Sequence, residues 1–380
     1  MQPIVIIGSG LAGYTVAREL RKLNADFPIT LICADNGDFY SKPMLSNALH
    51  SGKTPAQLVT TAAAAMAQQL NLTLMAHTLA DKIDTQGKRV YTNQGSFAYA
   101  SLVLAVGAQT IPVALEGDAA ADVLTVNHLD DYAAFYQHLG VARHIVLIGG
   151  GLIGCEFAND LVTGGHRVTV VHPHHFPLQN LLPETVGNAL AAALQAVGVT
   201  WKFRATVTAV AKDPLGYRVT LSNGEQLIAD VVLSAIGLRP QKQLAQRSDI
   251  VVRRGVVVDD YLRTSASDIY AIGDCAEYGE RTLPYVLPIM NAARALVKTL
   301  TGEPTPVRFP YMPVAIKTPA LPLLVQLPAS DATGQWQVED QHGLKMLFVD
   351  RQGQMLGFVL AGERTKERAQ CLAKLPPLVQ

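Results

Sequence analysis

Short apolar runs alternate with amphipathic stretches along much of the chain. The runs Ile4–Ile7 and Ile145–Ile148 each precede a cluster of glycines, and helical periodicity follows over 11–23 and 152–163. Near-continuous apolar runs of this length are typical of strands in a parallel sheet, because helices cover both faces of such a sheet. The pattern therefore predicts an α/β fold.

This order occurs twice along the chain. Each glycine cluster and its helix are followed by a second strand, over Ile29–Cys33 in the first unit and 167–171 in the second. Each unit later contains an apolar strand that ends in glycine, at Gly107 and at Gly237. The repetition indicates two similar nucleotide-binding modules.

Antiparallel patterns occupy other parts of the chain. A hairpin is expected with strands 217–221 and 226–233 around Asn223-Gly224. A helix is expected from Pro288 to Leu300. The C-terminal region predicts a small α+β domain, with three strands and a final helix at 335–339, 345–349, 355–361 and 363–374.

Both glycine clusters fit the G-x-G-x-x-G pattern of dinucleotide-binding loops. The glycines allow a tight turn, close approach of a pyrophosphate and close packing of helix on strand, and the helix N-terminus attracts the anion. The candidate cofactor-binding residues are Gly8, Ser9, Gly10, Leu11, Ala12 and Gly13 in the first loop, and Gly149, Gly151, Leu152, Ile153 and Gly154 in the second. Two such loops predict two dinucleotides and electron transfer between them.

An acidic residue after the second strand, about 20 positions beyond the last glycine, normally binds a ribose hydroxyl. In the first unit, Cys33-Ala34-Asp35 occupies this region, and Asp35 is either the ribose ligand or an ordinary turn residue. In the second unit, His172 stands where NAD enzymes usually have Glu or Asp. The arginine typical of NADP enzymes is also missing there, so the loop by itself leaves the choice of nicotinamide cofactor open.

Composition excludes several other classes of function. The 380 residues include 31 basic and 31 acidic side chains, which gives no argument for binding nucleic acid or an anionic membrane. No apolar run approaches the ~18 residues of a membrane span, and no signal peptide is expected, so we predict a cytoplasmic protein without membrane insertion. The spacing of Cys33, Cys155, Cys275 and Cys371 fits neither a metal site nor a dithiol relay.

Several motifs together resemble the flavoproteins that bind two dinucleotides. They are the paired loops, the strand ends at 105–107 and 235–237, and Ala271-Ile272-Gly273-Asp274. Within that family, Tyr40–Ser46 resembles the ferredoxin- and rubredoxin-reductase branch, because the CxxxxC of disulfide reductases is absent. Segments 151–160 and 312–319 are similar to NADH-dependent rubredoxin reductases.

The resemblance implies two Rossmann-like domains of the glutathione-reductase type and a small C-terminal α+β domain. Residues 1–112 and 242–316 would bind noncovalent FAD, and 113–241 would bind NADH, with 317–380 as the third domain. NADH would pass a hydride to the flavin, which would then release single electrons to rubredoxin in a transient complex. Such a reductase feeds an electron-transfer chain, for example one for alkane hydroxylation.

The resemblance also assigns roles near the flavin. Lys42, next to Pro43, would lie near the flavin and pair with Glu156, and these two residues are the candidate catalytic groups. Lys42 would stabilise negative charge on the reduced flavin, and the alternative is an ordinary surface lysine. Lys317 matches a family position beside the flavin, although a lysine at a strand end before a proline is an equal interpretation.

Further flavin contacts come from two later segments. Asp274, after Gly273, would accept a hydrogen bond from a ribitol hydroxyl, and a helix N-cap is the alternative. The helix near Pro288 would direct its positive end at the flavin, with backbone contacts at Val286 and Leu287. Two other functions stay open: an NADH-dependent reductase of ferredoxin or flavorubredoxin, and a redox-sensing flavoprotein with negligible turnover.

Overall fold

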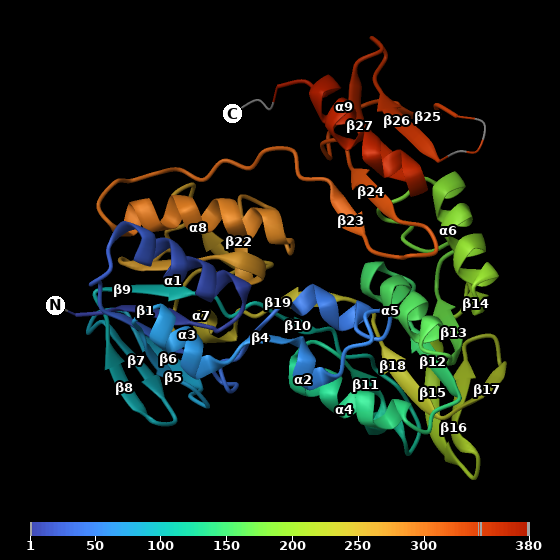
Figure 1. Ribbon diagram of the computed structural model, residues 1–380, viewed down its shortest axis with the longest axis horizontal. Coiled ribbons are helices and arrows are strands. Elements are labelled where there is room, and N and C mark those ends of the chain that lie inside the picture. The colour runs from blue at the N-terminus through green and yellow to red at the C-terminus, as the bar shows by residue number, and fades with distance from the viewer. Residues whose placement is uncertain (1, 341, 343, 378–380) are drawn as a thin grey trace. The chain divides into compact units, whose positions relative to one another are not determined.

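The structure is a computed structural model that describes residues 2–340, 342 and 344–377 (Figure 1), and the chain forms two compact units. The first unit contains the chain up to Lys42, Ala56–Gln109 and Leu238–Phe309. The second contains Pro43–Pro55, Thr110–Gly237 and the chain from Pro310 onward. Each unit therefore brings together segments that are far apart in the sequence.

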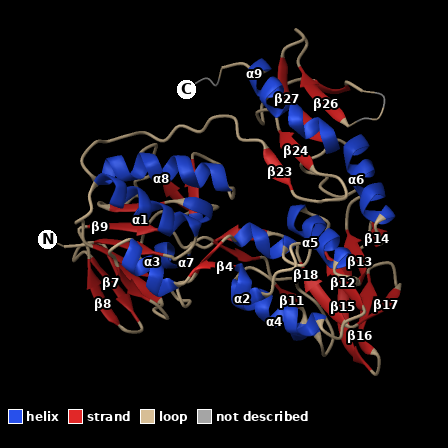
Figure 2. Cartoon of the chain, viewed as in Figure 1, coloured by secondary structure: helices blue, strands red, loops and turns tan. Residues whose placement is uncertain are grey.

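The first unit is built on a parallel sheet with strand order β21-β9-β1-β2-β5. Strand β1 lies at its centre, with Ile7 beside both Ile32 of β2 and Leu104 of β9. Helices α1 and α8 pack on each other in this unit (Figures 1 and 2). The elements that form this layer are β1 (Ile4–Ile7), α1 (Leu11–Leu23), β2 (Ile29–Ile32), β5 (Thr73–Met75), β9 (Ser101–Leu104), β21 (Ile269–Ala271) and α8 (Val286–Leu300).

Smaller elements complete the first unit. They include an antiparallel sheet of β6, β7 and β8 and three two-stranded pairings, β3 with β4, β10 with β19, and β20 with β22. Their bounds are β3 (Phe39–Tyr40), α2 (Pro55–Leu58), β4 (Val59–Thr61), α3 (Ala63–Gln69), β6 (Ala80–Asp84), β7 (Arg89–Thr92), β8 (Gly95–Ala98), β10 (Ala108–Thr110), β19 (Leu238–Pro240), α7 (Gln243–Arg247), β20 (Val256–Val258) and β22 (Ala276–Tyr278).

The second unit repeats the parallel design, with strand order β11-β18-β12-β13-β14. Ile148 of β12 pairs with Val171 of β13 and with Ser234 of β18. The elements are β11 (Leu124–Thr125), α4 (Leu129–Leu139), β12 (His144–Ile148), α5 (Leu152–Thr163), β13 (Arg167–His172), α6 (Glu184–Ala196), β14 (Val199–Phe203) and β18 (Val231–Ser234). A small antiparallel sheet adds β15 (Val207–Asp213), β16 (Gly216–Leu221) and β17 (Gln226–Ala229).

The C-terminal part of the second unit is an antiparallel sheet with strand order β23-β24-β27-β26-β25. Buried apolar residues of β27, such as Phe358 and Leu360, pack with Cys371 of the final helix. The elements are β23 (Val314–Ile316), β24 (Leu323–Gln326), β25 (Gln335–Val338), β26 (Lys345–Val349), β27 (Met355–Ala361) and α9 (Arg368–Lys374). The α/β fold class with a small α+β C-terminal region is therefore confirmed.

The prediction of one long hairpin strand over 226–233 was wrong. The strand is interrupted at Asp230, whose carboxylate oxygen Oδ2 accepts hydrogen bonds from the backbone N–H groups of Arg143 (2.8 Å) and His144 (2.7 Å). The first half therefore pairs antiparallel with β16, while the second half joins the parallel sheet as β18. The Asp230 side chain, which binds the backbone at the start of β12, therefore marks the point where the antiparallel sheet of β17 ends and the parallel sheet of β18 begins.

Two helix boundaries also differ from expectation. Helix α8 begins at Val286, earlier than Pro288, because proline is well tolerated in the first turn of a helix. The helix expected over 363–374 is a 3₁₀ turn over Gly362–Glu367 followed by α9. Among the described residues, no helix is long and apolar enough to cross a bilayer.

Candidate dinucleotide sites

The first glycine loop joins β1 to α1. Gly8 has a φ of +118°, and a Cβ there would lie 2.2 Å from the carbonyl oxygen of Ala105. A Cβ on Gly13 would lie 1.9 Å from the carbonyl oxygen of Gly8, whereas a Cβ on Gly10 would meet nothing within 4 Å. No side chain caps α1 at Gly10. The unsatisfied N–H groups of its first turn, which includes Leu11, therefore border an open cradle that suits a pyrophosphate.

The turn after β2 is tied to this loop through Asp35. The hydroxyl of Ser9 donates a hydrogen bond to Asp35 Oδ1 at 2.8 Å, and the N–H of Gly37 donates to the same oxygen at 3.0 Å. Nearby, burial raises the pKa of the Cys33 thiol to about 12, so this group stays protonated. Asp35 is thus a turn residue that also holds the glycine loop, and its ribose contact, like one at Ala34, stays a prediction.

Asp274 lies in the short 3₁₀ turn Gly273–Cys275 after β21. A Cβ on Gly273 would lie 3.0 Å from Cβ of Ala12, so this turn packs on the first turn of α1. Burial raises the pKa of Asp274, and the positive charge of Lys42 opposes that rise. The structure therefore brings Asp274 and Lys42 into electrostatic contact beside the first loop, while their contacts with flavin stay a prediction.

The start of α8 presents apolar side chains to the surface. Val286 and Leu287 are 43% and 44% exposed, and no side chain caps the helix at Tyr285. A free helix N-terminus favours negative charge near it. Gly107, at the end of β9, has a φ of +72°, and its carbonyl oxygen accepts a hydrogen bond from Gln241. These residues lie in the first unit, as expected, and their contacts with a cofactor stay a prediction.

The second glycine loop, between β12 and α5, has the same steric design. Gly149 has a φ of +108°, and a Cβ there would lie 2.7 Å from the carbonyl oxygen of Ala235. A Cβ on Gly154 would lie 2.0 Å from the carbonyl oxygen of Gly149. Gly151 begins α5 without a side-chain cap and has open space beside it. The first turn of α5, with Leu152 and Ile153, therefore offers a second anion cradle.

His172, the last residue of β13, is folded into this loop. Its ring is buried, and its Nδ1 accepts a hydrogen bond from the N–H of Gly150 at 3.0 Å, which places the proton of the neutral ring on Nε2. Burial, and to a smaller extent the charge of His174, lower the pKa of His172 to about 4. A Cβ on Gly150 would lie 3.0 Å from Cγ of the ring. The ring thus supports the glycine loop, and a ribose contact stays a prediction.

Gly237 follows β18 and has a φ of +119°. Its carbonyl oxygen accepts a hydrogen bond from the N–H of Ile111 at 3.0 Å. The positive φ of Gly237 thereby allows the chain to turn where it leaves the second unit, next to Ile111, where the chain has just entered that unit. A direct contact with a cofactor stays a prediction here too.

Glu156 lies on α5, is 2% exposed and joins two distant segments of the second unit. Ser46 donates its hydroxyl to Glu156 Oε2 at 2.6 Å, and the backbone N–H of Lys317 donates to Oε1 at 3.0 Å. The Lys317 ammonium forms an ion pair with Oε2 at 3.6 Å and also donates to the carbonyl oxygen of Pro43. A buried carboxylate is costly unless it is paired, and these donors satisfy it.

Two more polar residues share this face of α5. Asn159 Oδ1 accepts a hydrogen bond from the N–H of Ala320 at 2.9 Å. Asp160 accepts from the N–H groups of Leu49 (3.1 Å) and His50 (2.7 Å). Burial raises the pKa of Asp160, and these donors oppose the rise. Helix α5 therefore binds both the segment after Lys42 and the segment after Lys317.

The sequence motifs predicted site roles for Glu156 and Lys317. They did not predict that Ser46, Asn159 and Asp160 take part in the same group of polar contacts. A signal was present, because positions three and four residues apart in a helix share a face, as Glu156, Asn159 and Asp160 do. Lys317 supplies the observed charge partner of Glu156. The expected pairing of Lys42 with Glu156 stays a prediction.

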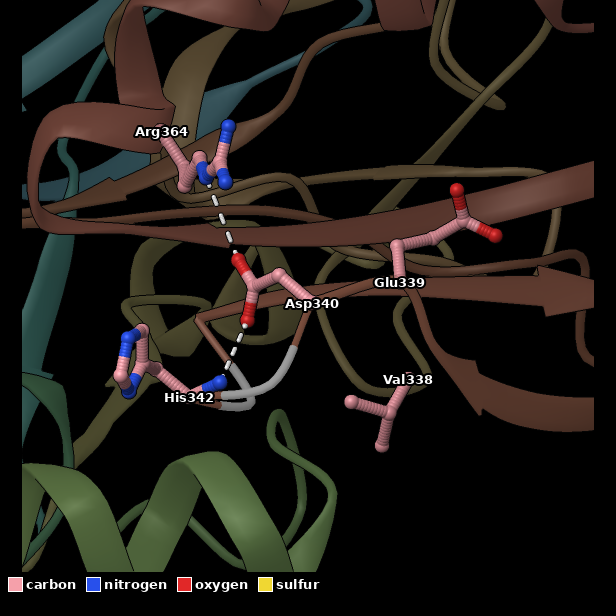
Figure 3. Close-up of a pocket in the computed structure, with 5 residues that line it drawn as sticks. All are labelled: Val338, Glu339, Asp340, His342 and Arg364. Atoms are coloured by element: carbon pink, nitrogen blue, oxygen red, sulfur yellow. Dashed lines mark hydrogen bonds and ion pairs between the residues drawn. The ribbon is translucent and has the colours of Figure 1, made fainter.

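A shallow concavity of about 620 Å³ lies at the turn after β25 (Figure 3). Asp340 accepts hydrogen bonds from Nε of Arg364 and from the backbone N–H of His342, each at 3.2 Å. These donors satisfy the carboxylate of Asp340. Within the described residues, no group of three or more His, Cys, Asp or Glu side chains is arranged to hold a metal.

Comparison with known proteins assigns the fold to a family. Residues 2–296 match the family model for pyridine nucleotide-disulphide oxidoreductases. The chain belongs to the pyridine nucleotide-disulphide oxidoreductase family. Residues 306–375 match a second model, the rubredoxin binding C-terminal domain, which covers the antiparallel sheet of the second unit.

Individual relatives extend over the whole chain. A rubredoxin-NAD(+) reductase from Alcanivorax borkumensis is 45% identical over 100% of both chains. A nitric oxide reductase FlRd-NAD(+) reductase from Aliivibrio fischeri is 40% identical over 96% of both. Among solved structures, the ferredoxin reductase for the CYP199A2 system from Rhodopseudomonas palustris superimposes with a TM-score of 0.89 at 25% identity, covering 99% of this chain and 96% of the other. The resemblance to flavoproteins with two dinucleotides is thereby confirmed.

Proposed function

We propose that this protein is an NADH-dependent flavoprotein that reduces rubredoxin. One observation carries the proposal: a single chain combines two uncapped, sterically open glycine loops with a C-terminal region that matches a rubredoxin-binding domain. The first loop would hold FAD, and the second would hold NADH. The full-length similarity to a protein named rubredoxin-NAD(+) reductase supports this choice of donor and acceptor.

The residues present fit FAD in the first unit. The space beside Gly10 and the free N–H groups of α1 suit its pyrophosphate, and Asp274 offers an acceptor for a ribitol hydroxyl. When bound, FAD supplies a group that takes up two electrons together and releases them singly, as the one-electron iron of rubredoxin requires. The flavoproteins that this chain resembles bind FAD at their first glycine loop.

The chain itself contributes orientation and charge. The N-terminal turns of α1 and α5 hold pyrophosphates through backbone N–H groups. Glu156 fixes the backbone of Lys317 and pairs with its ammonium, and the Lys317 side chain is 40% exposed at the surface of the second unit. Lys42 and Asp274 place a second positive and negative pair beside the first loop. Preorganised charges of this kind stabilise the charge that develops as a hydride is transferred.

The decisive experiment is stopped-flow spectrometry of the purified, FAD-loaded protein. We expect NADH to bleach the flavin and rubredoxin to reoxidise it rapidly, with [2Fe–2S] ferredoxin much slower. Comparable rates with both acceptors would contradict the specificity for rubredoxin. Slow reduction by NADH with ferricyanide as acceptor would contradict an enzyme altogether and favour a redox sensor.

Lys42→Ala tests the charge beside the first loop. We expect reduction by NADH to slow by about tenfold while the FAD content stays near normal, because the pyrophosphate and ribitol contacts remain. Lys53→Ala, which changes an exposed lysine elsewhere in the chain, is the matched control and should leave the rate unchanged. A wild-type rate in Lys42→Ala would show that Lys42 is an ordinary surface lysine.

A second acceptor deserves the same assay, because a relative named nitric oxide reductase FlRd-NAD(+) reductase is 40% identical over nearly the full length. This relative favours a flavorubredoxin as the alternative partner. Stopped-flow reoxidation of the NADH-reduced protein by free rubredoxin and by flavorubredoxin, at equal iron concentration, distinguishes the two acceptors. Faster reoxidation by flavorubredoxin would replace rubredoxin in the proposal.

Two further proposals concern organisation and location. We propose that residues 1–112 and 242–316 bind FAD, 113–241 bind NADH, and 317–380 form the third domain. We also propose a cytoplasmic location, because all four cysteines are free and buried, which is typical of proteins in a reducing compartment. Limited proteolysis and cell fractionation test these proposals.

A further inference from the structure

We propose that Asn159 and Asp160 are positioning residues for the transfer of a hydride from NADH. Each of them anchors one of the two segments that meet at Glu156, so that the groups around this carboxylate keep one arrangement. The inference rests on the proposed function, since it takes the surroundings of Glu156 as part of the nicotinamide site.

The carboxylate of Glu156 is the point where two distant segments of the second unit meet. Its Oε2 accepts the hydroxyl of Ser46, and its Oε1 accepts the backbone N–H of Lys317. These bonds fix distances, but a segment that is held at one point can still rotate about that contact. Each segment therefore needs a second anchor if its donor is to keep a fixed direction.

Asp160 supplies the second anchor for the segment of Ser46. Its Oδ2 accepts the backbone N–H of Leu49 at 3.1 Å, and its Oδ1 accepts that of His50 at 2.7 Å. Glu156 and Asp160 are four residues apart on α5, which is about 6 Å along the helix axis. The segment from Ser46 to His50 is therefore held to the helix at two separate points.

Asn159 supplies the second anchor for the segment of Lys317. Its Oδ1 accepts the backbone N–H of Ala320 at 2.9 Å. The chain turns tightly here, because the buried Thr318 hydroxyl donates to the carbonyl oxygen of Leu321 at 2.7 Å and the N–H of Leu321 donates back to the carbonyl oxygen of Thr318 at 3.0 Å. This turn ties Ala320 to the segment that begins at Lys317, so an anchor at one holds the other.

The chemistry of the two anchors suits positioning better than simple packing. Asn159 is 3% exposed and Asp160 is 2% exposed. A buried acceptor that loses its donor is left unsatisfied, so each segment stays at its anchor. Apolar contacts would also hold these segments, but they are non-directional and would not fix the orientation of the backbone. Locking a site residue through buried hydrogen bonds from its neighbours is the usual way to preorganise a site.

Positioning of this kind should affect the rate of the reaction more than binding. The proposed anion cradle is the first turn of α5, which includes Leu152 and Ile153, and Asn159 lies about two turns further along the helix. NADH should therefore still bind when an anchor is lost. A hydride moves only between atoms held in one geometry, so a small misplacement of the surrounding groups slows this step strongly.

Hydrogen exchange followed by mass spectrometry tests the anchors without any turnover. In the full-length protein, Asp160→Asn should speed exchange at the N–H groups of Leu49 and His50 about tenfold, because the asparagine turns its own N–H groups toward one of these donors. Exchange at Ala320 should stay native in this variant. Asn159→Ala should have the opposite pattern, with faster exchange at Ala320 alone.

Stopped-flow reduction of the FAD-loaded protein tests the positioning role. Each variant should slow reduction at saturating NADH about fivefold, with a Kd for NADH within about twofold of native. In a Glu156→Gln background Asp160→Asn should slow it by less than about twofold more, because its effect passes through the group already changed. The same holds for Asn159→Ala in a Lys317→Gln background. Asp230→Asn is the matched control, because this carboxylate also accepts two backbone N–H groups in the second unit, and it should keep the native rate.

The outcomes separate this inference from the proposed function. If NADH reduces the native protein and both variants keep its rate, or if the losses add in the double variants, the two residues are structural and the inference alone is overturned. If Asp160→Asn does not fold, Asn159→Ala decides the same question on the other segment. If NADH does not reduce the native FAD-loaded protein, the proposed function fails and the positioning role fails with it, whatever hydrogen exchange shows of the anchors.

Discussion

The two glycine loops of this protein share their steric design and differ in the group that ties each loop to the next strand. In the first unit, the Ser9 hydroxyl donates to the carboxylate of Asp35, and in the second, the backbone N–H of Gly150 donates to the neutral ring of His172. A Cβ on the last glycine would approach the first glycine's carbonyl oxygen almost identically, at 1.9 Å and 2.0 Å. The close helix–strand contact thus constrains the glycines, while the polar partners are free to differ.

The helices that follow the loops diverge in the same way. Thr15 and Glu156 occupy the same position, two residues after the last glycine. Helix α1 packs against α8, and Thr15 contacts Met290 of that helix, whereas α5 uses Glu156 to bind Ser46 and Lys317. Helix α1 of the first unit is thus specialised for packing on another helix. Helix α5 of the second unit is specialised for holding the loops of Ser46 and Lys317 near the proposed nicotinamide.

The largest expected effect comes from the last glycine of each loop. Gly13→Ala and Gly154→Ala both force the helix away from its strand, because the new Cβ overlaps a backbone oxygen. Gly13→Ala should lose FAD, and Gly154→Ala should keep FAD but slow reduction by NADH about a hundredfold. Flavin absorbance and stopped-flow reduction measure the two effects.

Gly140→Ala is the control for this pair. The new Cβ would lie 3.7 Å from the nearest atom, the carbonyl oxygen of Gln137, which is an ordinary contact. It should leave both readouts unchanged. Loss of FAD from Gly154→Ala to the same extent as from Gly13→Ala would show that the loops do not bind separate dinucleotides.

The next effect concerns pH and stability in the second unit. An unfolded histidine gains its proton near pH 6.5, but folded His172 resists protonation down to about pH 4. The unfolded state therefore binds more protons as pH falls through this window, and up to about 3 kcal/mol of stability is lost between pH 6.5 and 4. Urea unfolding followed by fluorescence of Trp201, which lies against Gly150, should report this loss.

His172→Asn isolates this contribution, because the asparagine oxygen can replace Nδ1 as acceptor for Gly150 without titrating. The variant should lose stability less steeply below pH 6.5, and the remaining slope includes His144, whose pKa burial also lowers. The aligned residue of the first unit is Cys33, whose thiol does not titrate in this range. An unchanged slope in the variant would show that His172 is not the titrating group.

A smaller effect is expected at Glu156. Glu156→Gln keeps an acceptor for the N–H of Lys317 but removes the charge that holds its ammonium, so reduction by NADH should slow about tenfold with normal FAD content. Lys317→Gln and the double variant complete a thermodynamic cycle measured by stopped flow. If Glu156 acts through Lys317, the double variant is no slower than either single one, and additive losses would contradict this. Glu363→Gln, an exposed residue, is the control.

The smallest effect is expected at Ser9, the position that is Gly150 in the second loop. Ser9→Ala removes one hydrogen bond to Asp35, worth about 1 kcal/mol, while Gly37 keeps the carboxylate in place. FAD binding to the apoprotein, followed by fluorescence quenching, should weaken about fivefold. The same substitution at half-buried Ser96 of β8, whose hydroxyl accepts a hydrogen bond from Arg89, should leave FAD affinity unchanged. Unchanged affinity in Ser9→Ala would mean that the loop does not depend on Asp35.

Much of the fold and of both loops is determined by local sequence. The apolar run before each glycine cluster and the periodicity after it placed α1 at Leu11–Leu23 and α5 at Leu152–Thr163, as observed. Local geometry requires glycine at the two ends of each loop, because the first glycine has a positive φ and a Cβ on the last would lie 1.9 Å or 2.0 Å from the carbonyl oxygen of the first. The cofactor classes and the C-terminal partner followed from motifs that are contiguous in the chain.

Tertiary structure alone decided which polar groups meet. Glu156 binds Ser46 and Lys317, which lie 110 and 161 positions away, and Arg204 joins His174 through a backbone bond between loops after neighbouring strands. The inward turn of the His172 ring likewise depends on space left by Gly150. Such contacts depend on strand order and helix orientation, which a local pattern of residues does not encode, because each partner satisfies its hydrogen bonds only after distant segments have packed together.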